Sequence, residues 1–144
     1  MIYAVDTNIV LDIFFDDPTF SQPAIDFFNT LTPLDSLVAC DVVWAEASAA
    51  FNDKAVFARL MNDFGIAYSP MPDHAAVRAG AIWRLARSAS HNAKTRQRLA
   101  IVPDFLIGAH ALECADALIT RDRGFMRKWF ADLKVIDPSK LKRL

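Results

Sequence analysis

The chain of 144 residues has the length of one domain with a buried core, since 53% of its residues are hydrophobic and 23% are charged. This composition excludes a disordered or fibrous protein, and no apolar run has the length that a membrane span needs. The N-terminus lacks the basic leader and cleavage signal of a secretory peptide, so we expect a cytoplasmic protein.

The charges are unevenly distributed along the chain, although the net charge is only −1. Residues 1–53 contain nine acidic residues and no Lys or Arg, whereas residues 54–144 contain all 16 basic residues and eight acidic ones. The two parts therefore carry about −9 and +8, which sum to −1. This asymmetry indicates a charged partner, unless folding mixes the two parts on the surface.

The first third of the chain alternates apolar runs with turn-forming residues. Residues 2–5 are a short β-prone run, which predicts a strand that stops at Asp6. A short helix over 9–15 follows, and apolar residues at helical spacing predict a second helix over 19–31. The second expected strand covers residues 36–40.

The rest of the chain continues the same alternation. Asp41 is a natural N-cap for a long helix over 42–64, and Gly65 closes that helix. The remaining expected elements are a strand over 66–68, a helix over 73–90, a basic loop or extended helix end over 90–98, a helix over 103–115, a strand over 117–120, a helix over 124–130 and a strand over 134–136. This order predicts an α/β fold, with residues 1–144 forming a single α/β/α sandwich around a mostly parallel central sheet.

Four acidic residues take related positions in this arrangement. Asp6 follows the first expected strand, and Glu46 lies in the second turn of the helix after the second strand. Asp104 lies at the start of a helix, and Asp122 follows the fourth strand by one intervening residue. Because ligands bind beyond the carboxyl ends of the strands in an open parallel sheet, we expect all four to project from the same edge.

Carboxylates gathered at one edge repel one another, and a divalent cation relieves that repulsion. Mg²⁺ and Mn²⁺ prefer oxygen ligands, and the chain offers no His and Cys set that favours zinc. Such a metal activates water and neutralises charge on a phosphate, which suits phosphodiester hydrolysis. We therefore predict that one set of residues binds the metal and catalyses hydrolysis, namely Asp6, Glu46, Asp104 and Asp122. Taken singly, each of these acids has an ordinary alternative as a helix-cap or surface residue.

Two polar neighbours of these acids are expected to support the site. Asn8 is placed to hydrogen-bond Asp6 or a metal-bound water, and Thr120 to orient Asp122 or water; helix capping and a plain strand end are the alternatives. Asp12, within the first helix, is expected on a solvated face.

Four stretches that contain the acids resemble the motifs of a known family. They are residues 5–12, 44–48, 103–112 and 118–125. In this order and at these separations they resemble the PIN domain, and closely the VapC toxins of bacterial and archaeal toxin–antitoxin pairs. Gly108 stands where such helices usually carry Ala; glycine costs helix stability by about 1 kcal/mol and permits close helix packing.

The resemblance implies an endoribonuclease that depends on Mg²⁺ or Mn²⁺, frequent homodimerisation, and inhibition by a small VapB-like antitoxin. We expect the antitoxin to insert a basic segment beside Asp6 and Asp104, because the guanidinium fork of Arg pairs with carboxylates. Exposed apolar residues of the first helices, for example Phe14, Phe15 and Phe20, are expected to give that segment a groove.

A basic, acid-free stretch is the expected contact for the RNA backbone, with a plain solvated surface as the alternative. The residues predicted to bind RNA are Arg84, Arg87, Lys94, Arg96 and Arg98.

Competing functions make different demands on the same residues. A haloacid-dehalogenase-like phosphatase needs a second Asp two residues after Asp6, where this chain has Asn8. A response-regulator receiver needs a phosphoacceptor Asp after the central strand, whereas the middle strand here ends at Tyr68-Ser69-Pro70. The last alternative is a non-catalytic RNA-binding PIN module, which the presence of all four acids disfavours.

Overall fold

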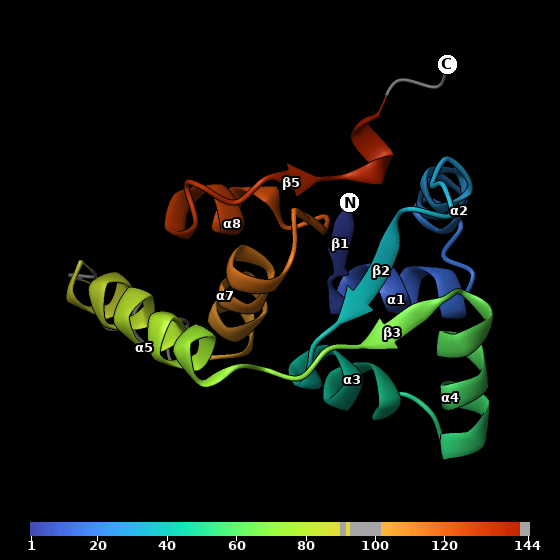
Figure 1. Ribbon diagram of the computed structural model, residues 1–144, viewed down its shortest axis with the longest axis horizontal. Coiled ribbons are helices and arrows are strands. Elements are labelled where there is room, and N and C mark those ends of the chain that lie inside the picture. Colours follow the sequence, from blue (N-terminus) through green and yellow to red (C-terminus); the bar gives the residue numbers. More distant parts are fainter. Residues whose placement is uncertain (90–91, 93–101, 142–144) are drawn as a thin grey trace.

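The fold is built on one parallel sheet (Figure 1). The computed structural model describes residues 1–89, 92 and 102–141. Within these residues the strands are β1 (Ile2–Val5), β2 (Ser36–Ala39), β3 (Ile66–Tyr68), β4 (Ala117–Ile119) and β5 (Val135–Ile136). Their order is β3-β2-β1-β4-β5, and every neighbouring pair is parallel. The predicted α/β class and parallel sheet are confirmed.

Helices connect the strands and cover both faces of the sheet. Those in the described residues are α1 (Thr7–Phe14), α2 (Ser21–Asn29), α3 (Asp41–Ser48), α4 (Lys54–Asp63), α5 (Asp73–Ser88), α7 (Pro103–Cys114), α8 (Arg123–Trp129) and the short 3-10 helix η1 (Pro138–Lys140). Helix α5 lies along α7, on its outer side (Figure 1). In the described part of the chain, no helix is both long and apolar enough to cross a bilayer.

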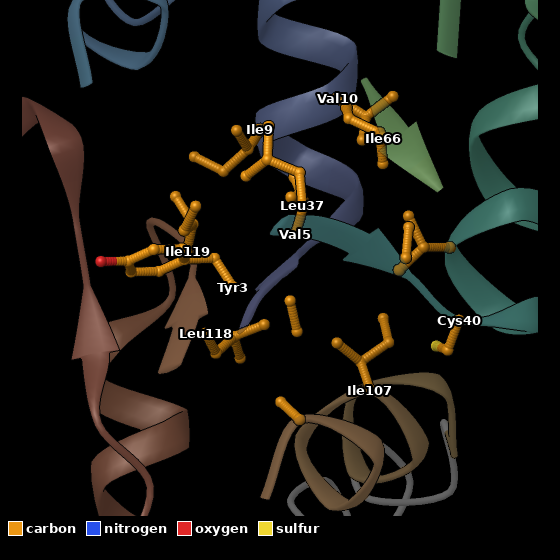
Figure 2. Packing of buried hydrophobic residues seen from close by; sticks show 14 of the residues in the cluster. Tyr3, Val5, Ile9, Val10, Leu37, Cys40, Ile66, Ile107, Leu118 and Ile119 are labelled. Carbon is orange, nitrogen blue, oxygen red and sulfur yellow. The ribbon is translucent and has the colours of Figure 1, made fainter. Parts of the chain in front are cut away.

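The core explains why the central strands are apolar throughout. Val5 and Ile119, the last residues of β1 and β4, pair in register and are almost fully buried. Figure 2 shows Ile9 and Val10 of α1 on one side of the strands and Ile107 of α7 on the other. Because both faces of these strands are covered, their carboxyl ends form a fixed platform for the residues that follow.

The long helix expected over 42–64 is wrong, because α3 and α4 are separate helices. The Asp53 carboxylate accepts a hydrogen bond from the backbone N–H of Ala55 at 2.8 Å and so caps a new helix. Asp41 is the first residue of α3 rather than its N-cap. Its carboxylate instead accepts hydrogen bonds from the Tyr68 hydroxyl and, at 2.6 Å, from the backbone N–H of Met71.

The helix expected over 19–31 is shorter than predicted for a similar reason. The Asp17 carboxylate accepts hydrogen bonds from the backbone N–H groups of Thr19 and Phe20, which holds these residues in a turn before α2. At the other end the Thr30 hydroxyl donates to the carbonyl of Phe27 at 2.7 Å, beyond the last residue of α2.

Gly108 is a point of very close packing between α7 and the end of α8. A Cβ atom built on Gly108 would lie 2.4 Å from Cε2 and 2.7 Å from Cζ of Phe130. The Phe130 side chain is only 2% exposed, so the ring has little room to move aside. The close packing expected at this glycine is therefore present, and it excludes even a methyl group.

We expect Gly108→Ala to lower the free energy of unfolding by about 1–3 kcal/mol, because the methyl group overpacks a filled core. The matched control is Gly80→Ala in the middle of α5, where an added Cβ meets nothing within 4 Å. That change is expected to raise stability by up to ~1 kcal/mol, the helix-propensity difference. Urea unfolding measures both variants. Equal effects of the two substitutions would contradict the packing argument, and adding Phe130→Leu to Gly108→Ala should reduce the loss.

Candidate active site

Asp6 lies directly beyond β1, at the carboxyl edge of the sheet. Its backbone N–H continues the sheet by donating to the carbonyl of Ile119 at 3.0 Å. Its side chain, in a residue only 4% exposed, accepts hydrogen bonds from the Thr7 backbone N–H at 2.7 Å and the Thr120 hydroxyl at 2.6 Å. Asp6 thus caps α1 and also points a carboxylate into the space beside β4.

Thr120 and Asn8 hold this carboxylate in place. The Thr120 hydroxyl donates to Asp6 and accepts from the Asn8 side-chain amide at 3.2 Å and from the Asp122 backbone N–H at 3.0 Å. The Asn8 amide also donates to Asp6 at 3.3 Å, and its carbonyl oxygen accepts from the Arg121 backbone N–H at 3.3 Å. The two predicted supporting residues therefore connect Asp6 to the loop that carries Asp122.

Glu46 reaches the same edge from α3, on the exposed surface. Its carboxylate accepts a hydrogen bond from the Thr7 hydroxyl at 2.6 Å, which ties α3 to the first residue of α1. Thr7 was not among the residues predicted for the site. Its position beside Asp6 was visible, but nothing in the sequence indicates that its hydroxyl reaches a residue 39 positions away.

Asp104 and Asp122 complete the edge. Asp104 lies in the first turn of α7, after Pro103, and is partly buried. Asp122 is exposed and directly precedes α8. Both carboxylates therefore lie near the N-terminal end of a helix, where the helix dipole favours negative charge.

Electrostatics shows that the four carboxylates are close enough to repel one another. Burial raises the pKa of Asp6 to about 6, against the hydrogen bonds from Thr120 and Thr7, and repulsion from Asp104 and Glu46 adds to the rise. Burial also raises the pKa of Asp104, and repulsion from Asp122 and Glu46 raises it further. Among the described residues, none of the four carboxylates forms an ion pair with Lys or Arg.

The donor chemistry of this cluster fits a hard divalent cation. In the described part of the chain, no three His, Cys, Asp or Glu side chains converge closely enough to form a ready-made metal site. The four carboxylates nevertheless supply only oxygen donors, and no Lys or Arg of residues 1–89 or 102–141 forms an ion pair with them that would relieve their repulsion. Oxygen donors with uncompensated negative charge are what Mg²⁺ and Mn²⁺ require.

The predicted RNA-binding residues are only partly described. Arg84 and Arg87 are exposed on α5, and the Arg87 guanidinium lies 5.0 Å from the centre of the Trp83 ring. Lys94, Arg96 and Arg98 lie outside the described residues.

Fold and site together define an α/β protein with an acidic centre at the carboxyl edge of a parallel sheet. The chain belongs to the PIN domain family, since the model of that family matches residues 3–130. This confirms the resemblance seen in the four acid-containing stretches. PIN domains are generally nucleases, so membership supports hydrolysis of nucleic acid.

Solved structures share the fold at low sequence identity. A structure of VapBC-1 from nontypeable Haemophilus influenzae matches with a TM-score of 0.71 and 20% identity, over 97% of this chain and 100% of that chain. VapBC2 from Rickettsia felis, bound to a promoter DNA fragment, gives 0.68 and 17%, over 94% and 98% of the two chains. A toxin–antitoxin complex from Klebsiella pneumoniae gives 0.62 and 21%, over 94% and 97%. No curated protein matches the chain.

Proposed function

We propose that this protein is an Mg²⁺- or Mn²⁺-dependent endoribonuclease. The observation that carries the proposal is the cluster of mutually repelling carboxylates, which have no cationic partner in the part of the chain that the structure describes. Burial and repulsion raise the pKa of Asp6 and Asp104 in this cluster. Membership of the PIN domain family supports it independently. A cation would relieve the repulsion and make the cluster useful for phosphodiester hydrolysis.

Some residues of the chain would bind the cation, and others would orient these ligands. The proposed metal ligands and catalytic residues are Asp6, Glu46, Asp104 and Asp122. When bound, the cation supplies a water of lowered pKa and neutralises charge on the phosphate. Thr120 and Asn8 orient the Asp6 carboxylate, and the Thr7 hydroxyl orients Glu46. Glu46 and Asp122 are exposed, so a cation can reach their carboxylates from solvent.

We propose that the basic stretch, with Arg84 and Arg87 at its start, binds the RNA backbone. Two observations support this placement. Both side chains are exposed on α5, which packs against α7, the helix whose first turn carries the site residue Asp104. The segment also belongs to the part of the chain with a net charge of +8, which suits a polyanion.

We propose further that the protein is the toxin of a toxin–antitoxin pair, since the solved toxin–antitoxin complex from Klebsiella pneumoniae has the same fold. The antitoxin would place an Arg beside Asp6 and Asp104. Its apolar part would fit a groove of about 1050 Å³ between α2 and η1, lined by Phe20, Phe27 and others. Of the three phenylalanines expected to form such a groove, Phe20 lines it, whereas Phe14 and Phe15 do not.

Phe14 is instead packed into an aromatic cluster with Phe51, Phe57 and Phe64.

We propose that the protein acts as a homodimer, and the exposed side chains of Val77 and Leu85, eight residues apart on α5, support this proposal. We also propose that residues 1–144 function as a single domain and that the protein acts in the cytoplasm.

The phosphatase alternative is disfavoured by the use that the structure makes of Asn8. Its amide nitrogen donates a hydrogen bond to Asp6, and its oxygen accepts one from the Arg121 backbone N–H, so Asn8 links these two residues. An amide also has no acidic proton to donate to a leaving group. The two functions therefore predict different substrates.

Incubation with structured RNA and Mn²⁺ should give discrete fragments, and EDTA should abolish the cleavage because the carboxylates cannot act without a cation. Gel electrophoresis measures the fragments. The same preparation should leave p-nitrophenyl phosphate almost unchanged. Rapid turnover of that monoester with intact RNA would reject the ribonuclease proposal and favour the phosphatase.

A further inference from the structure

Two arginines flank Asp122 in the sequence, and both are paired with acids outside the carboxylate cluster. The Arg121 guanidinium binds Asp12 through two hydrogen bonds, Nε to Oδ2 at 2.6 Å and Nη2 to Oδ1 at 3.0 Å. Arg123 Nε lies 3.5 Å from Oδ2 of Asp137. The two positive charges nearest to Asp122 in sequence are therefore directed elsewhere.

The Arg121–Asp12 pair is the tighter of the two, and its acid is buried, whereas the Arg121 side chain is 33% exposed. Asp12 was expected on a solvated face, but the residue is only 6% exposed, so that expectation is wrong. The Arg121 guanidinium also lies 4.2 Å from the centre of the Phe20 ring, which covers one of its faces. The hydrogen bond to Asp12 raises the pKa of Arg121, so the guanidinium stays charged at every physiological pH.

The ion pair with Asp12 matters because of where Arg121 lies. It stands between Thr120, whose hydroxyl binds Asp6, and Asp122. A guanidinium is a rigid fork that pairs with carboxylates in two-point contacts. Arg121 is next to Asp122, and its backbone N–H binds Asn8, which in turn binds Asp6. A guanidinium released from Asp12 would therefore start from the loop that adjoins the cluster, where binding one of its carboxylates would neutralise charge that a divalent cation needs.

We propose that Asp12 is a positioning residue that keeps the Arg121 guanidinium off the carboxylate cluster of Asp6, Glu46, Asp104 and Asp122. The negative charge of the cluster thereby stays available to a cation. This inference rests on the proposed function, because it concerns the same carboxylates. It differs from a purely structural role, in which the ion pair would only anchor the loop before α8.

Calorimetric titration with Mn²⁺ separates the two roles. Asp12→Asn should weaken Mn²⁺ binding about tenfold, equivalent to ~1.4 kcal/mol, because the freed Arg121 competes with the cation. The double variant Asp12→Asn with Arg121→Gln should bind Mn²⁺ nearly as well as wild type. The control is Asp16→Asn, an exposed acid two residues beyond α1 that removes the same charge and should leave binding unchanged.

A loop anchor predicts the opposite pattern, because the double variant has lost the ion pair as completely as the single one. Mn²⁺ binding that stays weak in the double variant, or that is unchanged in Asp12→Asn, would overturn the inference. A second measurement uses no metal. In carboxyl ¹³C NMR titrations, Asp12→Asn should lower the pKa of Asp6, and Arg121→Gln should reverse that change.

The two measurements also separate this inference from the proposed function. Wild-type protein that fails to bind Mn²⁺ would count against the proposed function, whereas the NMR comparison would still support or overturn the role of Asp12. An unaltered Asp6 pKa in Asp12→Asn would overturn that role even if Mn²⁺ binds to the wild type.

Discussion

Replacing Asp104 by asparagine should reduce RNA cleavage by roughly a hundredfold or more, since the loss of residues that merely orient metal ligands already costs 10–100-fold. Asp104 is coupled by repulsion to the other three carboxylates, directly or through the shift that it imposes on Asp6. The substitution keeps the size of the side chain and removes only its charge. Initial rates of cleavage in Mn²⁺ measure the effect, and calorimetry should show a matching loss of Mn²⁺ affinity.

The matched control is Asp132→Asn, an exposed acid between α8 and β5, which should cleave RNA like wild type. The toxin proposal adds a readout in cells. Expression of the wild-type chain should arrest bacterial growth, Asp104→Asn should not, and co-expression of the small gene next to this one should restore growth.

The possible failures of this experiment are distinct. Full cleavage by Asp104→Asn would reject the assignment of the site. Growth that is the same for wild type and Asp104→Asn, at equal soluble yield, would reject the toxin role and leave the fold untouched. Arrest that no neighbouring gene relieves would reject the antitoxin alone.

Without divalent cations, the contribution of Asp6 to the free energy of unfolding should fall as the pH rises. Folding raises the pKa of Asp6 from 3.8 to about 6, so the folded state favours the neutral carboxyl group. This stabilisation is fully present below pH 3.8 and is lost as the pH rises through about 6. Its size is ~3 kcal/mol, at 1.36 kcal/mol per pKa unit.

The variant Asp6→Asn isolates this term, because it cannot ionise. Its amide disturbs the hydrogen bonds from Thr7 and Thr120, but that cost does not depend on pH. The free energy of unfolding of wild type, relative to the variant, should therefore fall by ~3 kcal/mol between pH about 3.5 and about 8. Urea unfolding in EDTA measures it. A flat difference would contradict the burial of an ionisable group at this position.

At pH about 8, Mn²⁺ should raise the free energy of unfolding of wild type, because a ligand that binds only the folded state stabilises it. The free energy of unfolding of Asp6→Asn should be almost unaffected by Mn²⁺. The same carboxylate that weakens the metal-free protein would then strengthen the metal-bound one.

The features that could be predicted from the sequence are those with local signals. Short apolar runs bounded by turn-forming residues located all five strands of the described chain. The acids Asp6, Glu46, Asp104 and Asp122 were placed at one edge because parallel strands end together, and the repulsion among them agrees with that placement.

The features that could not be predicted depend on contacts between distant segments. The strand order depends on how the helices pack against the sheet, so the sequence of an individual strand does not indicate its neighbours. The pairing of Arg121 with Asp12 joins residues 109 positions apart, and only the folded chain shows that Asp12 is buried. The break between α3 and α4 does have a local signal, since Asp53 is a residue type that favours the N-cap position, and its side chain caps α4.

The place of β1 in the middle of the sheet has a consequence for synthesis on the ribosome. β1 pairs with β2 soon after both have emerged, but its other neighbour, β4, is made more than 100 residues later. Asp6 gains its hydrogen bond from the Thr120 hydroxyl only then, across 114 residues of chain. A nascent chain that stops before Thr120 thus carries Asp6, Glu46 and Asp104 without the strand that brings the centre together. Under the proposed function, unfinished copies should accordingly leave the surrounding RNA intact, and cleavage should begin only when nearly all of the sheet has been made.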